Sequence, residues 1–76
     1  MIQEFEQAVL LVDLPAEGLV AGDVGTVVDI TANGQSATLE FFNFAGETVA
    51  VVLVGVDQVR PVSANEVMHA RPVKSA

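Results

Sequence analysis

The fold is decided by the stretch Gly22-Asp23-Val24-Gly25-Thr26-Val27-Val28-Asp29-Ile30. Gly22 can adopt the positive φ that a tight turn needs, and Asp23 can hydrogen-bond the local backbone. From Val24 onward every second residue is β-branched, which is typical of a half-buried β-strand. The stretch therefore predicts a turn that leads into a twisted strand over residues 24–31. The residues expected to share its core-facing side are Val24, Thr26, Val28 and Ile30.

A β-hairpin is expected directly after this strand. Asn33-Gly34 is typical of a two-residue type I′ turn, because both central residues need positive φ. That turn would join the strand to a second one over residues 36–42, with Gly25 opposite Phe42, whose ring could cover the bare glycine backbone. The core pairs that it predicts are Val28 with Leu39, Ile30 with Ala37, and Thr26 with Phe41.

A second hairpin is expected at Asn43-Phe44-Ala45-Gly46, which suits a type I turn with a glycine bulge. It leads into a strand over residues 48–54. The preferred register buries the larger set of side chains, with Val49 opposite Phe41, Val51 opposite Leu39 and Leu53 opposite Ala37. The alternative is a two-residue loop at Ala45-Gly46, which would bury Ala50, Val52 and Val54 instead. In both registers the outer face of this strand stays apolar.

The remaining segments complete a small sheet. A first strand is expected at residues 7–12, followed by a long loop in which Leu14, Leu19 and Val20 cap the core. A short edge strand containing Pro61 follows at 56–62. Ser63 and Glu66 have capping-box spacing, which predicts one or two helical turns ending before Pro72, and residues 71–76 are expected to be loose.

These expectations define an all-β chain. We expect a five-stranded SH3-like β-barrel domain over residues 1–62, and a C-terminal short helix and flexible tail over 63–76. An OB-type barrel is the less favoured closure at this length. Closing the sheet would also protect strand edges that invite aggregation in so apolar a chain.

Charge is the most unusual property of the composition. The formal net charge is −7, from ten acidic and three basic residues, and residues 1–59 contain no base at all. The three bases are Arg60, Arg71 and Lys74. Such a body repels phosphate backbones, because nucleic-acid affinity depends on Lys and Arg. A basic protein partner is the natural complement, and the alternative is that the excess acid only keeps an apolar protein in solution.

Several activities find no support in the sequence. There is no cysteine, no signal peptide and no apolar run long enough to span a bilayer, so we expect a cytoplasmic protein with no membrane contact. No serine or histidine is spaced for a catalytic triad, so we expect no enzyme activity. Asp13, Glu17 and Asp23 share one loop but follow no calcium-loop pattern, and His69 has no neighbouring ligand. We therefore expect no metal or cofactor.

Two resemblances concern the family. The stretch from Gly22 to Val27 resembles the start of a KOW motif, found in SH3-like modules that often touch RNA or RNA polymerase. The longer pattern is similar to a family of small uncharacterised bacterial domains, which implies an SH3-like fold, a bacterial source and no assigned catalytic residues. Members of that family often sit beside toxin-like genes. The segments that carry this resemblance are 13–19, 22–28, 39–41, 46–52 and 58–62.

We expect a non-enzymatic protein-interaction module, of antitoxin or immunity type, that binds a basic partner through an acidic and apolar surface. The expected polar contacts are Glu17, Asp23, Glu40 and Glu47, and the expected apolar anchors are Phe42, Phe44 and Val52. Two alternatives remain open. One is a KOW-like RNA- or ribosome-associated module, and the other is a structural homo-oligomer that pairs its strand edges.

Overall fold

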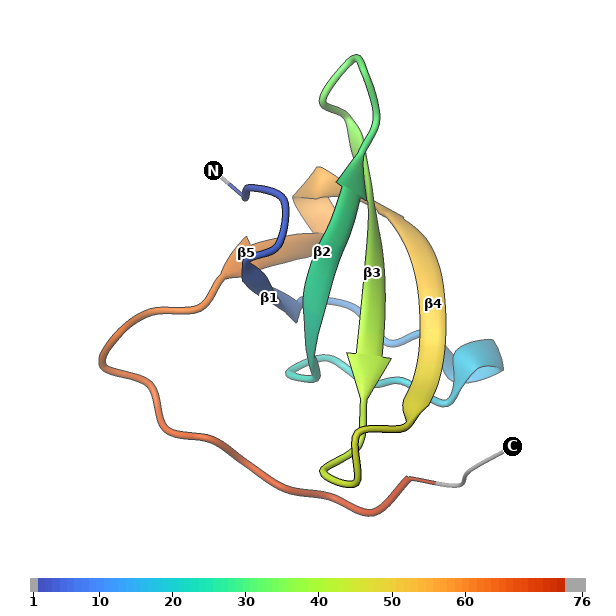
Figure 1. Cartoon of the computed structure of the whole chain (residues 1–76), viewed down its shortest axis with the longest axis vertical. Helices are drawn as coiled ribbons and strands as arrows, with labels where there is room; N and C mark the ends of the chain where they lie inside the picture. Colours follow the sequence, from blue (N-terminus) through green and yellow to red (C-terminus); the bar gives the residue numbers. More distant parts are fainter. Residues whose placement is uncertain (1, 74–76) are drawn as a thin grey trace.

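Five antiparallel strands form one sheet in the computed structural model, which describes residues 2–73. The strand order is β4-β3-β2-β1-β5, so β4 and β5 are the two edges (Figure 1). The all-β prediction is therefore confirmed. The elements are β1 (Gln7–Leu10), the 3-10 turn η1 (Pro15–Glu17), β2 (Val24–Ile30), β3 (Ser36–Phe42), β4 (Thr48–Gly55), the 3-10 turn η2 (Val56–Gln58) and β5 (Val59–Pro61).

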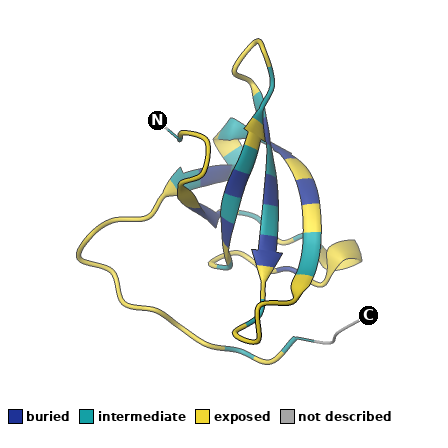
Figure 2. Ribbon diagram, viewed as in Figure 1, coloured by how far each residue is buried: buried dark blue, intermediate teal, exposed yellow. Residues whose placement is uncertain are grey.

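Every strand contributes buried side chains to one core, and Figure 2 colours the buried positions dark blue along the ribbon. Leu10, Val27 and Leu39 are fully buried, and Leu19 from the β1–β2 loop closes one end at 2% exposure. Leu19 therefore caps the core as expected, whereas Val20 beside it is 40% exposed. The buried cluster comprises Ala8, Leu10, Leu19, Val27, Ala37, Leu39, Phe41, Val52, Val54 and Val59.

A β-bulge in β2 changes which of its residues face the core. Val27, not Val28, lies opposite Leu39, and the register shifts before Ile30 meets Ala37 as predicted. At the bulge, β2 contains one residue more than β3, so the alternation of the β2 side chains between the two faces reverses there. The prediction that Val24, Thr26 and Val28 face the core is therefore wrong, since Gly25 and Val27 are buried instead.

Gly25 explains why the core uses this face of β2. A Cβ built on Gly25 would lie 2.9 Å from Cε2 of Phe41, so the aromatic ring sits directly over the glycine. The small Ala8 is the register partner of Gly25 on β1. The ring thus fills the space that two small residues leave. A ring over Gly25 was expected, but it belongs to Phe41 and not to Phe42.

The first hairpin has the predicted pairing of residues next to its loop, but the turn is of a different type. The Thr31 N–H donates to the Ser36 carbonyl at 2.9 Å, and the Gly34 N–H donates to the Thr31 carbonyl at 2.8 Å. Gly34 has positive φ but Asn33 does not, so the type I′ assignment is wrong. The Asn33 side chain instead accepts bonds from the Thr31 hydroxyl and the Gln35 N–H, which stabilises a wider loop.

The second hairpin has the predicted turn but not the predicted register. Gly46 has a φ of 84°, and its N–H donates to the Asn43 carbonyl at 3.0 Å, as a type I turn with a glycine bulge requires. A further register shift follows, between Phe42 opposite Thr48 and Phe41 opposite Ala50. This shift reverses which side chains of the rest of β4 face the core. Val52 and Val54 are buried, whereas Val51 and Leu53, predicted to face the core, are 56% and 66% exposed.

The C-terminal region contains no helix among the residues that the structure describes. Only a turn forms at residues 64–65, and the chain then runs extended past the open end of the sheet (Figure 1). The predicted helix over 63–70 is therefore wrong. Glu66 still caps the Ser63 N–H at 2.6 Å, but its carboxylate also binds Arg60 on β5. Residues 74–76 of the predicted loose tail lie outside the described part of the chain.

Candidate binding groove

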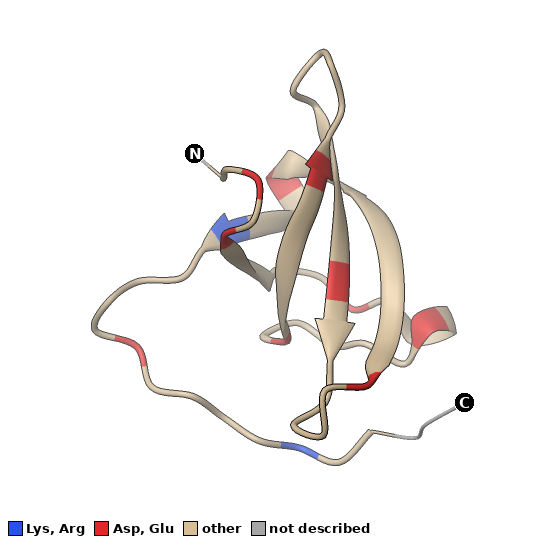
Figure 3. Ribbon diagram, in the orientation of Figure 1, with Lys and Arg blue, Asp and Glu red and all other residues tan. Residues whose placement is uncertain are grey.

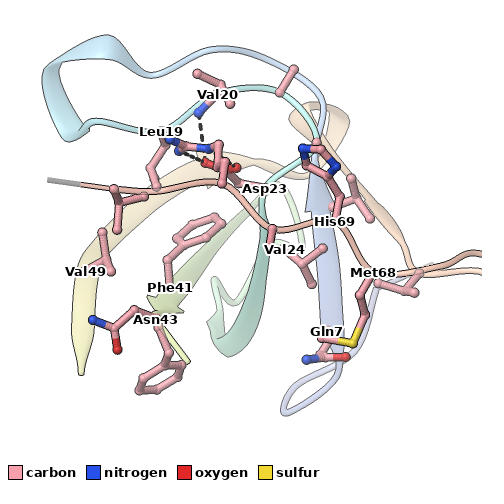
Figure 4. Close-up of a pocket in the computed structure, with 18 of the residues that line it drawn as sticks. Gln7, Leu19, Val20, Asp23, Val24, Phe41, Asn43, Val49, Met68 and His69 are labelled. Atoms are coloured by element: carbon pink, nitrogen blue, oxygen red, sulfur yellow. Dashed lines mark hydrogen bonds and ion pairs between the residues drawn. The ribbon is translucent and has the colours of Figure 1, made fainter. Parts of the chain in front are cut away.

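The C-terminal segment 62–73, here called the strap, lies along a groove at the end of the sheet. Figure 4 looks into this groove, where Phe41, Val24 and Val49 come from the sheet and Met68 and His69 from the strap. The space between strap and sheet measures about 680 Å³ and is open to solvent. Its lining is mainly apolar, with charged groups at the points where the strap is anchored.

The first anchor joins the strap to β5. The Arg60 guanidinium donates to both carboxylate oxygens of Glu66, at 2.9 Å (Nη1–Oε1) and 2.6 Å (Nη2–Oε2). The Arg60 hydrogen bonds, with a further one from the Ser63 N–H, lower the pKa of Glu66 to about 2. Both side chains remain substantially exposed, so the pair orients the strap more than it stabilises the fold.

The second anchor joins the far end of the strap to the β1–β2 loop. Arg71 donates from Nε to Oδ1 of Asp23 at 2.9 Å and from Nη2 to Oδ2 at 2.5 Å. The same Nη2 lies 3.0 Å from the Gly18 carbonyl oxygen. Asp23 is only 16% exposed in its side chain and Arg71 is 28% exposed. This pair is therefore the more sheltered of the two anchors.

The acceptors around Arg71 are held by the loop itself. The Val20 N–H donates to Oδ2 of Asp23 at 2.9 Å, and Gly22 and Gly18 both have the positive φ that these turns require. We call the Asp23 carboxylate and the Gly18 carbonyl the arginine socket. Burial raises the pKa of Asp23, but the hydrogen bonds from Arg71 and Val20 outweigh it, so the pKa is lowered overall. The socket is thus a preformed, ionised acceptor for a guanidinium group.

Aromatic side chains stand beside the groove at the β3–β4 hairpin. Phe42 is 49% exposed and Phe44 is 81% exposed. The hairpin that presents them is held by Asn43, whose side chain accepts the N–H groups of Ala45 and Glu47. Two exposed phenylalanines on a hydrogen-bonded turn form a suitable apolar contact surface.

The structure divides the predicted contact residues into two groups. Glu40, Phe42, Phe44 and Glu47 belong to β3 and its hairpin, while Glu17 and Asp23 lie on the β1–β2 loop. Phe42, Phe44 and Asp23 border the groove.

Some predicted contact residues are already engaged or inaccessible. Glu40 accepts the Thr48 hydroxyl and Glu47 accepts the Asn43 amide. Val52 is 7% exposed and lies in the core, so its proposed role as a surface anchor is corrected. The cause is the register shift at the start of β4, which turned Val51 and Leu53 outward in its place.

Sequence reasoning missed the strap as part of the site. The signal available was a single arginine, Arg71, far along the chain from the acidic loop, and no local pattern relates it to Asp23. The separation is 48 residues, which only the tertiary fold can bridge.

Both arginines are neutralised within the molecule, as the ion pairs at Glu66 and Asp23 show. In Figure 3 the acidic residues spread over the strands and loops, whereas basic residues occur on β5 and the strap. Over residues 2–73 no three His, Cys, Asp or Glu side chains are grouped to hold a metal ion. No helix in that range has the length and apolar character to cross a membrane.

The fold and the groove define a small all-β domain with an acidic surface and a C-terminal strap. The chain belongs to the family described as Domain of unknown function (DUF4926), whose model matches residues 4–61. The strap lies beyond the matched region. No curated protein and no solved structure matches the chain significantly.

Proposed function

We propose that this protein is a non-enzymatic protein-interaction module that binds a basic partner through the groove end of the sheet. The observation that carries the proposal is the pairing of both described arginines inside the molecule. Because those positive charges are compensated internally, the field outside the protein is set by the surplus carboxylates. A field of one sign steers and orients a partner of the opposite sign.

The aromatic residues of the β3–β4 hairpin supply the apolar half of this surface. Phe42 and Phe44 lie between Glu40 and Glu47 in the sequence of β3 and its hairpin. A partner would therefore contact exposed aromatic rings that are flanked by carboxylates. Interfaces commonly combine a few aromatic anchors with a polar rim that sets orientation. This arrangement supports binding.

The finer family assignment is also part of this proposal. The strand order, with β1 between β2 and β5 and a 3-10 turn before β5, supports an SH3-like arrangement. An antitoxin or immunity role in the bacterial cytoplasm follows from the resemblance described above. A basic toxin-like protein would be the partner.

The test compares Phe44→Ala with Phe5→Ala. Phe5 is a matched control, because it is 77% exposed but does not line the groove. Tagged protein is incubated at low salt with lysate of the source cells. We expect the wild type and Phe5→Ala to retain one stoichiometric basic protein, and Phe44→Ala to lose most of it. Recovery of no stoichiometric partner at low salt would count against the proposal.

A structural homo-oligomer is a second candidate, favoured by the free edge of β4. This strand pairs only with β3 among the described residues, is eight residues long and contains neither charge nor proline. Edges of this kind readily pair with another strand. Light scattering over a range of concentrations should show a dimer that Leu53→Lys abolishes. A monomer at every concentration would eliminate this candidate.

A KOW-like nucleic-acid role is the remaining alternative. Its basic contacts would have to come from Arg60, Arg71 and Lys74, and the first two already bind carboxylates. A gel shift with RNA, repeated at increasing salt, tests it, because phosphate contacts weaken steeply with salt.

A further inference from the structure

The strap is held at its ends and hardly at all between them. Beyond Val62, which directly follows β5, the only backbone hydrogen bond found within residues 63–73 runs from the Glu66 N–H to the Ser63 carbonyl. Val67 and Met68, the apolar residues of its central part, are 92% and 80% exposed. The strap therefore adds no strand to the sheet and buries little apolar surface. Its position depends on the two ion pairs.

The arginine socket, in contrast, does not depend on the strap. The Val20 N–H, the turn at Gly22 and the left-handed Gly18 place its acceptors within one loop. A second loop hydrogen bond, from the Ala21 N–H to Oδ1 of Asp13, holds the same segment. If Arg71 left, Asp23 would keep its hydrogen bond from the Val20 N–H and would border the groove without a cation.

We propose that the socket and groove form a peptide-binding site for an extended, arginine-bearing segment of the partner protein, and that the strap occupies this site in the free molecule. The proposal rests on the function proposed above and names the chemistry that the partner must present. Arg71 shows the binding mode directly, with a guanidinium in a bidentate contact to Asp23 and a third contact to Gly18. The partner's arginine would replace it, and its flanking apolar side chains would fill the space beside Phe42 and Val24.

Arginine is required, and lysine does not suffice. The two carboxylate oxygens and the carbonyl accept from two different nitrogens of one planar guanidinium, a geometry that a single ammonium group cannot reproduce. The net charge of −7 adds long-range attraction for a basic segment, whichever residue carries the charge. The socket thus supplies specificity and the surface charge supplies the encounter rate.

The test uses the full chain and a synthetic peptide of residues 62–73 as the probe. Arg71→Ala frees the socket, because it removes the arginine with which the strap competes, while the pair of Arg60 with Glu66 still holds the other end of the strap. The apparent affinity of the wild type for the peptide is reduced in proportion to the fraction of molecules whose socket is open. We therefore expect the Arg71→Ala variant to bind the peptide at least about tenfold more tightly than the wild type. Amide shifts at Gly18, Asp23 and Phe44 in a ¹⁵N NMR titration report the binding place.

Two peptide variants test the role of the guanidinium without altering the protein. Replacing the peptide's arginine by alanine or by lysine should weaken binding to the Arg71→Ala chain about tenfold or more. Asp23→Asn in that chain should weaken binding equally, whereas Asp29→Asn, an exposed acid on β2, should not. Equal binding of the arginine and lysine peptides, or no binding by the Arg71→Ala chain at millimolar peptide, would overturn the proposal.

A random peptide library separates a foreign partner from a second copy. The Arg71→Ala chain should select peptides with one arginine beside apolar residues, and the double variant with Asp23→Asn should not. Exchange of straps between two wild-type molecules, seen as a concentration-dependent dimer that Arg71→Ala abolishes, would instead assign the socket to a second copy and overturn the proposal.

The two proposals fail in different ways. In the lysate experiment, a partner that is lost with Phe44→Ala but retained fully with Asp23→Asn would refute the socket and leave the interaction module standing. A partner retained by both variants would refute the groove as its binding place altogether.

Discussion

Gly25→Ala adds one methyl group at the most crowded place in the core. The new Cβ would lie 2.9 Å from Cε2, 3.0 Å from Cζ and 3.1 Å from Cδ2 of Phe41. Carbon atoms in ordinary contact are about 3.5–4.0 Å apart, so the ring would have to retreat by roughly 0.5–1 Å. Phe41 is only 3% exposed and its ring meets other core side chains when it moves.

The net cost follows from two opposing terms. Overpacking a close-packed core costs about 1–3 kcal/mol. Replacing a strand glycine by alanine recovers about 0.5–1 kcal/mol of backbone entropy. We therefore expect Gly25→Ala to lower the free energy of unfolding by about 0.5–2 kcal/mol, which in a domain of this size lowers Tm by about 2–16 °C.

Urea denaturation of a double-mutant cycle with Phe41→Leu measures the effect. In the Phe41→Leu background the ring is gone, so the added methyl group should be neutral or stabilising by up to about 1 kcal/mol. The coupling energy between the two sites should then be about 1–3 kcal/mol. A Gly25→Ala effect that is the same in both backgrounds, or a stabilisation in the wild type, would refute the close approach of ring and glycine.

Three further predictions concern the register, a turn and the strap. Leu39→Ala should destabilise by about 2–5 kcal/mol in urea denaturation, whereas Leu53→Ala should change stability by no more than about 0.5 kcal/mol, and a reversed order would contradict the register of β4. Gly46→Ala should cost about 1–2 kcal/mol, because alanine is strained at its φ of 84°, and an unchanged Tm would argue against the turn. The carboxyl of Glu66 should titrate near pH 2, against an ordinary value of 4.5, so the contact with Arg60 contributes fully above about pH 4.5 and is lost as the pH falls through about 2. An NMR titration checks this, and Arg60→Ala should move the midpoint back up.

Local chemistry was sufficient to predict which segments form strands and where the two hairpins turn. The β-branched residues at every second position of 24–30, with the turn residues Asn33-Gly34 and Gly46, predicted the bounds of β2, β3 and β4 to within one residue. Glycine carries this information because few other residues accept positive φ, so its position marks a turn irrespective of the rest of the fold. The charge balance, and with it the expectation of a basic partner, also needs only the sequence.

The inward faces of β2 and β4 could not be predicted in this way. Both strands have apolar residues on their two sides, so a one-residue shift exchanges one plausible face for another. The choice was made by volume: the Phe41 ring fits over Gly25, and the bulges at Val28 and at the start of β4 provide the shift that lets Val27 and Val52 meet Leu39.

The sequence by itself determined an all-β chain with two glycine turns and a strongly acidic body, because these properties depend on local backbone preferences and on a sum of charges. Only the tertiary structure decided which side chains are buried, and only it brought Arg71 to Asp23. Those outcomes depend on how side chains far apart in the chain pack against one another. The residues next to each of them in the sequence do not determine that packing.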